Sequence, residues 1–302
     1  MSHSVLTGGA LPMKRFGRAE QRAAYLFLAP ALVGAVVFAY GPIVMSFLLS
    51  FSHYSIIDTP RWIGLANYAA IFQDGTFWQS VGNTAYFTIV SVPVTMALAL
   101  LVAIALNQGY RWTVFARTFF YLPTISPMVA VALVWLWLYD PAYGALNYAL
   151  RALGLQGVLW LGSSAWAMPS VIIMSVWKSI GAVMVIYLAG LQGIPEQLYE
   201  AAKIDGATAW HRFRYVTVPQ LQPATMFILI TTLIGAFRVF DQVYVMTQGG
   251  PSNSTLTVVY EIYQNAFSYL RMGYASAEAM LLFVVILVFS LFNLRRLRVD
   301  WA

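Results

Sequence analysis

The chain contains no cysteine, which excludes disulfide bonds, thiolate metal sites and cysteine nucleophiles. Charge is also scarce, because only 9% of its 302 residues are Asp, Glu, Lys or Arg, against about 25% in an average soluble domain. No Gly-Lys pair occurs, so the phosphate-binding loop of ATPases is absent. Zinc-protease and nucleophile-elbow motifs are absent too. A membrane enzyme is therefore a remote alternative, and we expect no catalytic residue, metal site or ATP site in this chain.

Hydrophobic residues instead make up 60% of the chain, more than a soluble fold could hide from water. Six apolar segments are each long enough for a helix that crosses a bilayer, which takes about 20 residues. They are too long for barrel strands and lack the period-two alternation of such strands. We therefore predict an all-α polytopic membrane protein with six transmembrane helices. The predicted spans are residues 23–51, 80–107, 118–139, 167–192, 221–246 and 272–294.

The first apolar segment must be distinguished from a cleaved signal peptide. Its apolar run is well beyond the roughly 7–15 residues of a signal sequence, so we expect an uncleaved helix. Pro30 and the pair Gly41-Pro42 lie inside it, and the sequence leaves open whether they bend it. We predict that residues 23–79, this helix and its outer loop, are an addition to a five-helix core formed by residues 80–294.

Basic residues are distributed unevenly between the two sets of loops. Twelve Lys and Arg precede span one, follow span six or lie between spans two and three and spans four and five, whereas the opposite loops hold three. Because cytoplasmic loops carry an excess of Lys and Arg, we expect residues 1–22 and the tail, residues 295–302, to be cytoplasmic. This topology also accounts for the net charge of +6, so the charge does not indicate nucleic-acid binding.

The cytoplasmic loop of residues 193–220 has the pattern of two short helices joined by a turn. Pro195 suits the first turn of a helix, and Gly206 can adopt the left-handed conformation that ends one. Thr208 can cap a second helix, which Pro219 is expected to end. The alternative is a solvated connector that only carries basic charge. A connector, however, needs neither an Ala-Ala pair nor an Asp-Gly turn nor an aromatic second helix.

This loop resembles the coupling loop of ABC importer permeases. The matching residues are Glu200, Ala201, Ala202, Asp205, Gly206, Ala207, Phe213, Pro219 and Pro223. The resemblance implies that the loop, and Glu200 to Ala207 above all, docks in a cleft of a separate cytoplasmic ATPase. It also implies that the loop moves when the ATPase dimer closes, so the partner and not this chain would bind ATP and Mg.

Other stretches resemble the carbohydrate-importer branch, specifically the first of the two paired permeases of maltose and glycerol-3-phosphate importers. They are Leu26 to Pro30, Trp62 to Tyr68, Phe72, Asp74, Phe77-Trp78, Asn83-Thr84, Phe240-Asp241, Thr247, Gly249-Gly250-Pro251 and Thr255. The resemblance implies a multi-pass protein of the bacterial inner membrane, surrounded by lipid. The implied partners are a second, related permease, two copies of a cytoplasmic ABC ATPase and an extracytoplasmic solute-binding protein.

Four charged residues lie inside predicted spans: Lys178 in the fourth, Arg238 and Asp241 in the fifth, and Glu278 near the start of the sixth. Such charges are costly and usually face protein or water. One interpretation is a polar pathway in which they bind solute hydroxyls, with Trp177 and Tyr187 as candidate sugar-stacking aromatics. The other is structural: Arg238 and Asp241 would pair with each other, and Lys178 would bind backbone carbonyls or extend to the membrane surface.

We therefore expect a permease subunit that moves a sugar or related polyol inward by alternating access, driven by a partner ATPase. The first alternative is an importer permease for an amino acid, phosphate ester or peptide. The second is a secondary transporter or channel, which usually shows internal repeats and coupling-ion sites that are not recognisable in this sequence.

Overall fold

The computed structural model describes residues 18–108 and 111–296. Most of the predicted tail and most of the predicted N-terminal segment lie outside these residues. Two compact units divide the chain, residues 1–48 and residues 49–302. Among the described residues the only strands are β1 (Ser52–His53) and β2 (Arg61–Trp62), so the all-α prediction is confirmed.

The first unit is one long helical path built from α1 (Arg18–Ala35), the π-helix η1 (Val36–Tyr40) and most of α2 (Gly41–Leu49). Pro42 has no N–H to donate to the preceding turn. The chain widens into a π turn just before it, where the Gly41 N–H bonds to the Val36 carbonyl five residues back. The predicted helix therefore continues past both prolines with one local change of hydrogen bonding.

The second unit begins with the antiparallel β1–β2 pair and the short helix α3 (Ala66–Gln73). Helix α4 (Gly75–Leu106) follows and runs for 32 residues. Its start is fixed by Asp74, whose carboxylate accepts a hydrogen bond of 2.8 Å from the Thr76 N–H. This N-cap places the start of α4 five residues before the predicted span, because the apolar pattern records burial and not capping.

The third predicted span, residues 118–139, is wrong as a single straight helix. Helix α5 (Arg111–Ile125) and helix α6 (Met128–Leu138) meet at a bend of 100°. Pro127 causes the break, because it donates no hydrogen bond and disfavours the helical conformation of the residue before it. Five described helices are long and apolar enough to cross a membrane, and there are six spans if the bent pair counts as one.

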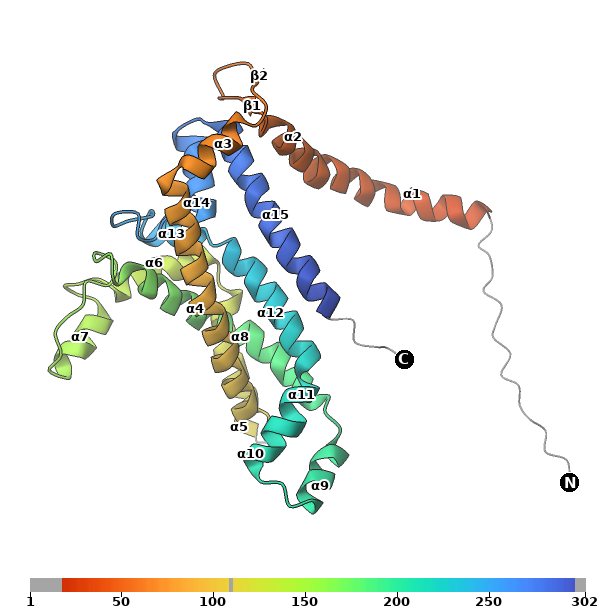
Figure 1. The fold of residues 1–302 in the computed structure, drawn as a ribbon. Coiled ribbons are helices and arrows are strands. Elements are labelled where there is room, and N and C mark those ends of the chain that lie inside the picture. Colours follow the sequence, from red (N-terminus) through yellow and green to blue (C-terminus); the bar gives the residue numbers. More distant parts are fainter. Residues whose placement is uncertain (1–17, 109–110, 297–302) are drawn as a thin grey trace, which may run out of the picture. The chain divides into compact units, whose positions relative to one another are not determined.

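Helices α4, α8 (Ala167–Gln192) and α12 (Gln222–Phe237) form the core of the second unit (Figure 1). The short helix α7 (Ala145–Ala152) precedes α8 in the chain. The bounds of α8 are those predicted. Gly190 lets α8 approach α12 closely, since a Cβ there would lie 2.9 Å from the side chain of Leu221. Two clusters of buried apolar side chains fill the space between the three helices.

The loop after α8 consists of α9 (Glu196–Ile204), α10 (Ala209–Arg212), the π-helix η2 (Phe213–Thr217) and α11 (Val218–Gln220). The predicted helix–turn–helix form is confirmed. One detail is wrong: Pro219 does not end the second helix. It follows the π turn of η2, in which the Val218 N–H bonds to the Phe213 carbonyl five residues back, so the helical path continues through it.

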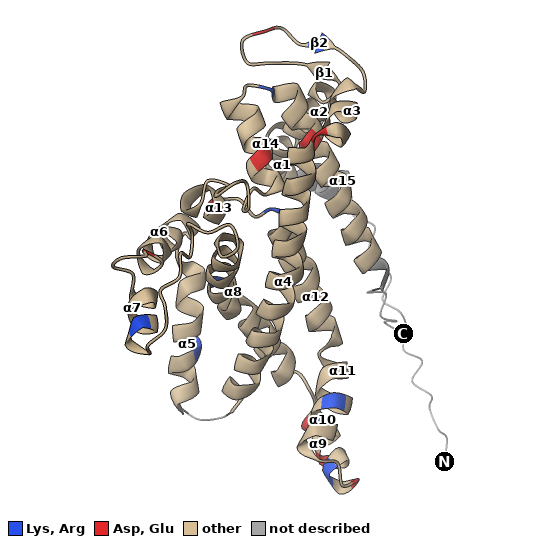
Figure 2. Cartoon of the chain, turned by 60° about the vertical axis from the view of Figure 1, so that its left-hand side comes forward, with Lys and Arg blue, Asp and Glu red and all other residues tan. Residues whose placement is uncertain are grey.

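The chain closes the second unit with shorter pieces and one long helix. The predicted fifth span stops after α12 and resumes as α13 (Asp241–Met246). Helix α14 (Val258–Tyr263) and the π-helix η3 (Gln264–Ser268) form a short helical segment after it. Helix α15 (Met272–Arg296) is the last span and packs on α3, α14 and α12. Figure 2 shows that the long helices carry few charges, whereas the α9–α10 loop is rich in them.

Candidate functional site

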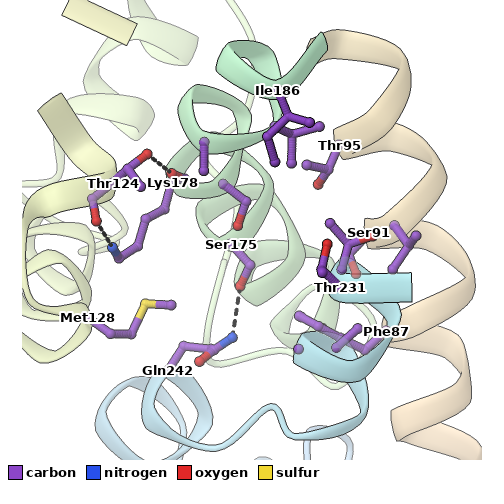
Figure 3. A pocket seen from close by; sticks show the side chains of 17 residues that line it. Phe87, Ser91, Thr95, Thr124, Met128, Ser175, Lys178, Ile186, Thr231 and Gln242 are labelled. Atoms are coloured by element: carbon purple, nitrogen blue, oxygen red, sulfur yellow. Dashed lines mark hydrogen bonds between the residues drawn. The ribbon is translucent and has the colours of Figure 1, made fainter. Parts of the chain in front are cut away.

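A cavity of about 380 Å³ lies between α4, α5, α8 and α12 (Figure 3). Its wall is unusual for an apolar bundle because hydroxyl groups converge on it from four helices. The polar side chains that line it are Ser91, Thr95, Thr124, Ser175, Lys178, Ser179, Thr231, Thr232 and Gln242. Lys178 is the single charged residue among the described residues of this lining.

Several of these hydroxyls donate to carbonyls of their own helix. Thr231 Oγ1 lies 2.9 Å from the Phe227 carbonyl, and Ser175 Oγ lies 2.7 Å from the Val171 carbonyl. A hydroxyl has one donor and two lone pairs, so this bond satisfies the donor and leaves acceptor capacity. The cavity wall can therefore accept hydrogen bonds from the hydroxyl groups of a solute.

Gln242 closes one end of the cavity by joining two helices. Its Nε2 donates to Ser175 Oγ at 3.2 Å, and the side chain is buried between α13 and α8 (Figure 3). The fifth span is interrupted at 238–240, between the end of α12 and the start of α13. The short helix α13 after this interruption carries the Gln242 amide to the cavity wall.

Lys178 also reaches the cavity wall, but its ammonium group points at the end of α5. Its Nζ donates to the carbonyls of Pro123 at 3.2 Å, Thr124 at 3.3 Å and Ser126 at 2.9 Å. In return, Thr124 Oγ1 donates to the Lys178 carbonyl at 3.2 Å. These are the backbone contacts that the structural interpretation of Lys178 anticipates, and they occur in a residue that borders the cavity.

The other four predicted pathway residues do not line this cavity. Trp177 is 44% exposed and borders apolar grooves elsewhere on α8. Tyr187 is only 2% exposed and packs in the core between α4 and α8. Arg238 and Asp241 are exposed at the break between α12 and α13, and no ion pair joins these two described side chains. The structure thus brings only Lys178 together with the hydroxyl groups.

The 193–220 loop has a defined shape because hydrogen bonds close both ends of the turn between α9 and α10. The N–H of Ala207 bonds to the Ala202 carbonyl at 2.9 Å and Gly206 has a φ of 76°, which together close α9 with a left-handed cap. Thr208 accepts from the His211 N–H at the start of α10. The six predicted docking residues lie in the second half of α9 or in the turn after it: Glu200, Ala201, Asp205 and Gly206 are exposed, and Ala202 and Ala207 are half-buried.

A hydrogen bond also joins the two helical segments of the loop, and large apolar side chains on the loop are exposed. Tyr199 Oη lies 2.9 Å from Thr217 Oγ1, which fixes α9 against η2. Ile204 is 86% exposed and Trp210 is 68% exposed on either side of the turn. A loop whose backbone is capped and cross-linked while its large apolar side chains stay uncovered has the properties of a docking surface.

The motif residues of the other matching stretches hold loops in place. Asn67 Nδ2 donates to two carbonyls near β1, and Asn83 Nδ2 donates to the carbonyls of Asn253 and Leu256 at 2.8 and 2.9 Å. Thr255 Oγ1 donates to the Gly250 carbonyl at 2.8 Å. None of them belongs to the described cavity lining. These residues position the elements around the cavity and do not form its wall.

Sequence reasoning missed the hydroxyl groups that form most of the polar wall. A signal was present in the spacing, because Ser91 and Thr95 on α4 and Ser175 and Ser179 on α8 are each four residues apart. That spacing puts both members of a pair on one helix face. The convergence of the faces is set by how the helices pack, which the spacing alone does not give.

A group of carboxyl side chains lies where α4, α14 and α15 meet, hereafter the α14–α15 joint. Glu278 is fully buried and accepts two hydrogen bonds from Asn265 Nδ2, at 3.1 and 3.0 Å. Glu261 is 3% exposed, and its Oε2 has no hydrogen-bond partner among the described residues. Burial raises the pKa of Glu261 to about 7, and the carboxylate of Asp74 adds to the rise. The joint therefore holds a carboxyl group that titrates near neutral pH.

Comparisons with known proteins agree on one kind of molecule. Residues 64–297 match the family described as "Binding-protein-dependent transport system inner membrane component". The chain is 37% identical over 276 residues to the probable ABC transporter permease protein YurN of Bacillus subtilis (strain 168), covering 90% of this chain and 94% of that protein. It is 35% identical to the trehalose/maltose transport system permease protein MalF of Thermococcus litoralis, covering 91% and 94%.

A solved structure is similar over nearly the same length. It is a bacterial alginate ABC transporter in complex with an alginate pentasaccharide-bound periplasmic protein. The TM-score is 0.83 at 25% sequence identity, and the likeness covers 93% of this chain and 95% of that one. The similarity thus extends beyond the 193–220 loop to the whole arrangement of helices.

Proposed function

Since the chain belongs to the family of binding-protein-dependent transport system inner membrane components, we propose that this permease subunit carries a sugar or related polyol inward. The observation that carries the sugar assignment is the cavity wall, where hydroxyl groups from α4, α5, α8 and α12 converge. A sugar donates and accepts many hydrogen bonds, which such a wall can match without a charged group. The relative named for trehalose and maltose supports the same class of solute.

The 193–220 loop is the proposed coupling loop, the site at which a partner ATPase docks. The exposed side chains of Ile204 and Trp210 support this role, as does the capped turn between them. The chain has no phosphate-binding loop of its own, so ATP and Mg would bind to the partner. ATP-driven closure of the ATPase would move the loop and favour one of two membrane-domain states, because only a differential contact shifts such an equilibrium.

The proposed assembly contains more than this chain. A second, related permease would complete the wall of the cavity, two ATPase copies would bind the coupling loops, and a solute-binding protein would deliver the sugar from outside. In this assembly α5 and α6 count as one broken span, which gives six spans with both termini in the cytoplasm. Broken helices at membrane depth occur where they line a cavity, and here Thr124 and Met128 border one on either side of the break.

Reconstitution tests the proposal directly. The chain would be placed in proteoliposomes with its permease, ATPase and binding-protein partners, and ATP-dependent uptake would be measured for two panels. The first holds maltose, trehalose, lactose and raffinose; the second holds glutamine, glycerol 3-phosphate and a dipeptide. We expect uptake of at least one sugar of the first panel. Uptake from the second panel alone would contradict the sugar assignment and leave the importer assignment in place.

A charge reversal tests the coupling loop separately. Glu200→Lys changes an exposed side chain of α9, so the spans should fold normally while the ATPase dissociates and uptake is lost. The matched control is Asp58→Lys, an exposed carboxylate in the turn between β1 and β2. The measurement is the amount of ATPase that co-purifies with the permeases. Normal ATPase retention and normal uptake by Glu200→Lys would refute docking at this surface.

A further inference from the structure

We propose that Lys178 is a positioning residue that ties the broken end of α5 to α8, so that the cavity wall moves with the helix leading into the coupling loop. The inference deepens the proposed function and rests on it. It assigns to Lys178 a role in transmitting motion, and not a hydrogen bond to the solute.

The break in the third span leaves backbone carbonyls at the end of α5 that need hydrogen-bond donors. Helix α5 ends at Ile125, and the last four carbonyls of a helix have no partner within it. The next helix leaves at 100°, and Pro127 has no N–H to offer. Unpartnered carbonyls are costly at membrane depth, where water is scarce. A donor from a neighbouring helix is therefore required for α5 to end here.

The ammonium group of Lys178 meets part of that need, because it bonds to two of the last four carbonyls of α5 and to that of Ser126 just beyond the helix. It carries three N–H donors and no acceptor, and it contacts three carbonyls, those of Pro123, Thr124 and Ser126. The carbonyl end of a helix also carries a negative partial charge, which favours a cation there. With three donors directed at three carbonyls, Lys178 has none left for a solute hydroxyl, although it borders the cavity (Figure 3).

A glycine one turn further along α8 supports the same contact independently. A Cβ at Gly181 would collide with the carbonyl of Phe120 and lie 2.9 Å from Thr124 Oγ1. The absence of a side chain at Gly181 therefore lets the backbones of α5 and α8 touch. The bond from Thr124 Oγ1 to the Lys178 carbonyl adds a second link at the same level. The two helices are joined over one turn by backbone contact, three ammonium bonds and a hydroxyl bond.

The α5–α8 contact lies between the cavity wall and the helix that leads into the proposed coupling loop. Helix α8 continues from Lys178 to Gln192, about 21 Å at 1.5 Å per residue, and α9 begins at Glu196. On the other side, Thr124 and Met128 flank the break and line the cavity. A displacement of the coupling loop along α8 therefore reaches the cavity wall through Lys178. Without Lys178, α8 could move while the end of α5 stays behind.

The test uses the full complex in proteoliposomes and compares Lys178→Met with Lys178→Arg. Methionine keeps the length and removes the donors, whereas arginine restores them. We expect Lys178→Met to hydrolyse ATP but to lower the sugar carried per ATP by about fivefold or more, the scale of an allosteric coupling. Lys178→Arg should restore most of that ratio. The probe is whichever sugar of the first panel the wild-type complex carries.

A distance measurement separates this role from solute binding. Because the chain has no cysteine, spin labels can be placed at Leu122→Cys and Ile173→Cys, which are exposed on α5 and α8. We expect the distance between the labels to be the same in nucleotide-free and ATP-trapped wild-type complexes. In Lys178→Met it should shift or broaden between these states. Gly181→Ala should act likewise, with Gly82→Ala as the control because its Cβ would meet no atom within 4 Å.

The outcomes distinguish this inference from the proposed function. If the label distance changed between the two states in wild type, the proposed link between α5 and α8 through Lys178 would be refuted, and the proposed importer function would be unaffected. A raised KM for the sugar in Lys178→Met, with an unchanged sugar-to-ATP ratio and label distance, would instead assign Lys178 to solute binding. If the wild-type complex carried no sugar of the first panel, the proposed cargo would be contradicted. The α5–α8 link through Lys178 would not be, because the label distances are measured with ATP and without a sugar.

Discussion

Replacing Glu261 by glutamine should stabilise the α14–α15 joint at alkaline pH. Glu261 is almost completely buried, and its Oε2 has no partner among the described residues. A buried carboxylate with one oxygen unpartnered is unfavourable even though Ser80 bonds to this carboxyl group, whereas the protonated acid is tolerated. Glutamine keeps the shape of the protonated acid and cannot ionise. The substitution therefore removes the cost of ionisation at high pH and leaves the low-pH structure nearly unchanged.

The sign and size of the effect follow from the pKa. Burial, with a contribution from Asp74, raises the pKa of Glu261 from 4.5 to about 7. Between these two values the folded protein binds more protons than the unfolded chain, so stability falls as the pH rises through this window. A shift of about 2.5 units corresponds to about 3 kcal/mol, present below pH 4.5 and lost above pH 7. Part of the gain from glutamine is offset because its amide also needs a partner, which leaves about 1–3 kcal/mol at pH 8.

The assay is thermal unfolding of the purified complex at pH 5, 6, 7 and 8. Wild type should lose stability across this range, and Glu261→Gln should show a flatter dependence and a higher midpoint at pH 8. Glu200→Gln, an exposed carboxylate on α9, serves as the control and should follow wild type. Equal pH dependence in Glu261→Gln and wild type would refute the assignment of a buried titrating group at this joint.

Two further substitutions probe the proposed machine at separate places. Gly206→Val should reduce uptake by weakening the capped turn, because a branched residue at a φ of 76° costs about 1–2 kcal/mol, while thermal unfolding of the spans should hardly change. Full uptake by that variant would show that the turn geometry is dispensable. Asn83→Ala removes two hydrogen bonds to loop carbonyls and should lower unfolding stability by about 1–3 kcal/mol without changing which sugar is carried. A changed order of preference in the sugar panel would show that Asn83 contacts the solute.

Most spans and the helix–turn–helix shape of the 193–220 loop were predictable because their signals are local. The apolar run that predicts residues 167–192 coincides with α8, and the run at 272–294 ends within two residues of α15. The loop was readable because caps are set by residues a few positions apart, such as Thr208 and the N–H of His211. The third span was predicted wrongly because hydropathy reports length and not direction. Pro127 was the available signal for the 100° bend.

The site was only partly predictable because it depends on contacts between distant segments. Lys178 is conspicuous in an apolar span, but its carbonyl partners are 52 to 55 residues earlier in the chain, and nothing local identifies them. Aromatic residues drew attention as sugar platforms, yet Tyr187 packs in the core and Trp177 borders a different face. The hydroxyls were overlooked because single Ser and Thr residues are common in spans and become a site only when several helices present them together.

The arrangement explains why the matching motifs identify an importer more securely than they identify its cargo. The side chains of Asn67, Asn83 and Thr255 donate hydrogen bonds to backbone carbonyls and so hold loops in place. This structural role does not depend on which solute is transported. The cavity hydroxyls differ, because residues such as Ser175 and Thr231 satisfy their donors within their own helices. Replacing one of them alters the surface offered to a solute while the helix keeps its backbone bonds. A substitution at a position such as Thr231 can therefore change the surface offered to a solute without disturbing either the α5–α8 contact or the 193–220 loop, whereas Thr124 serves both the cavity wall and that contact.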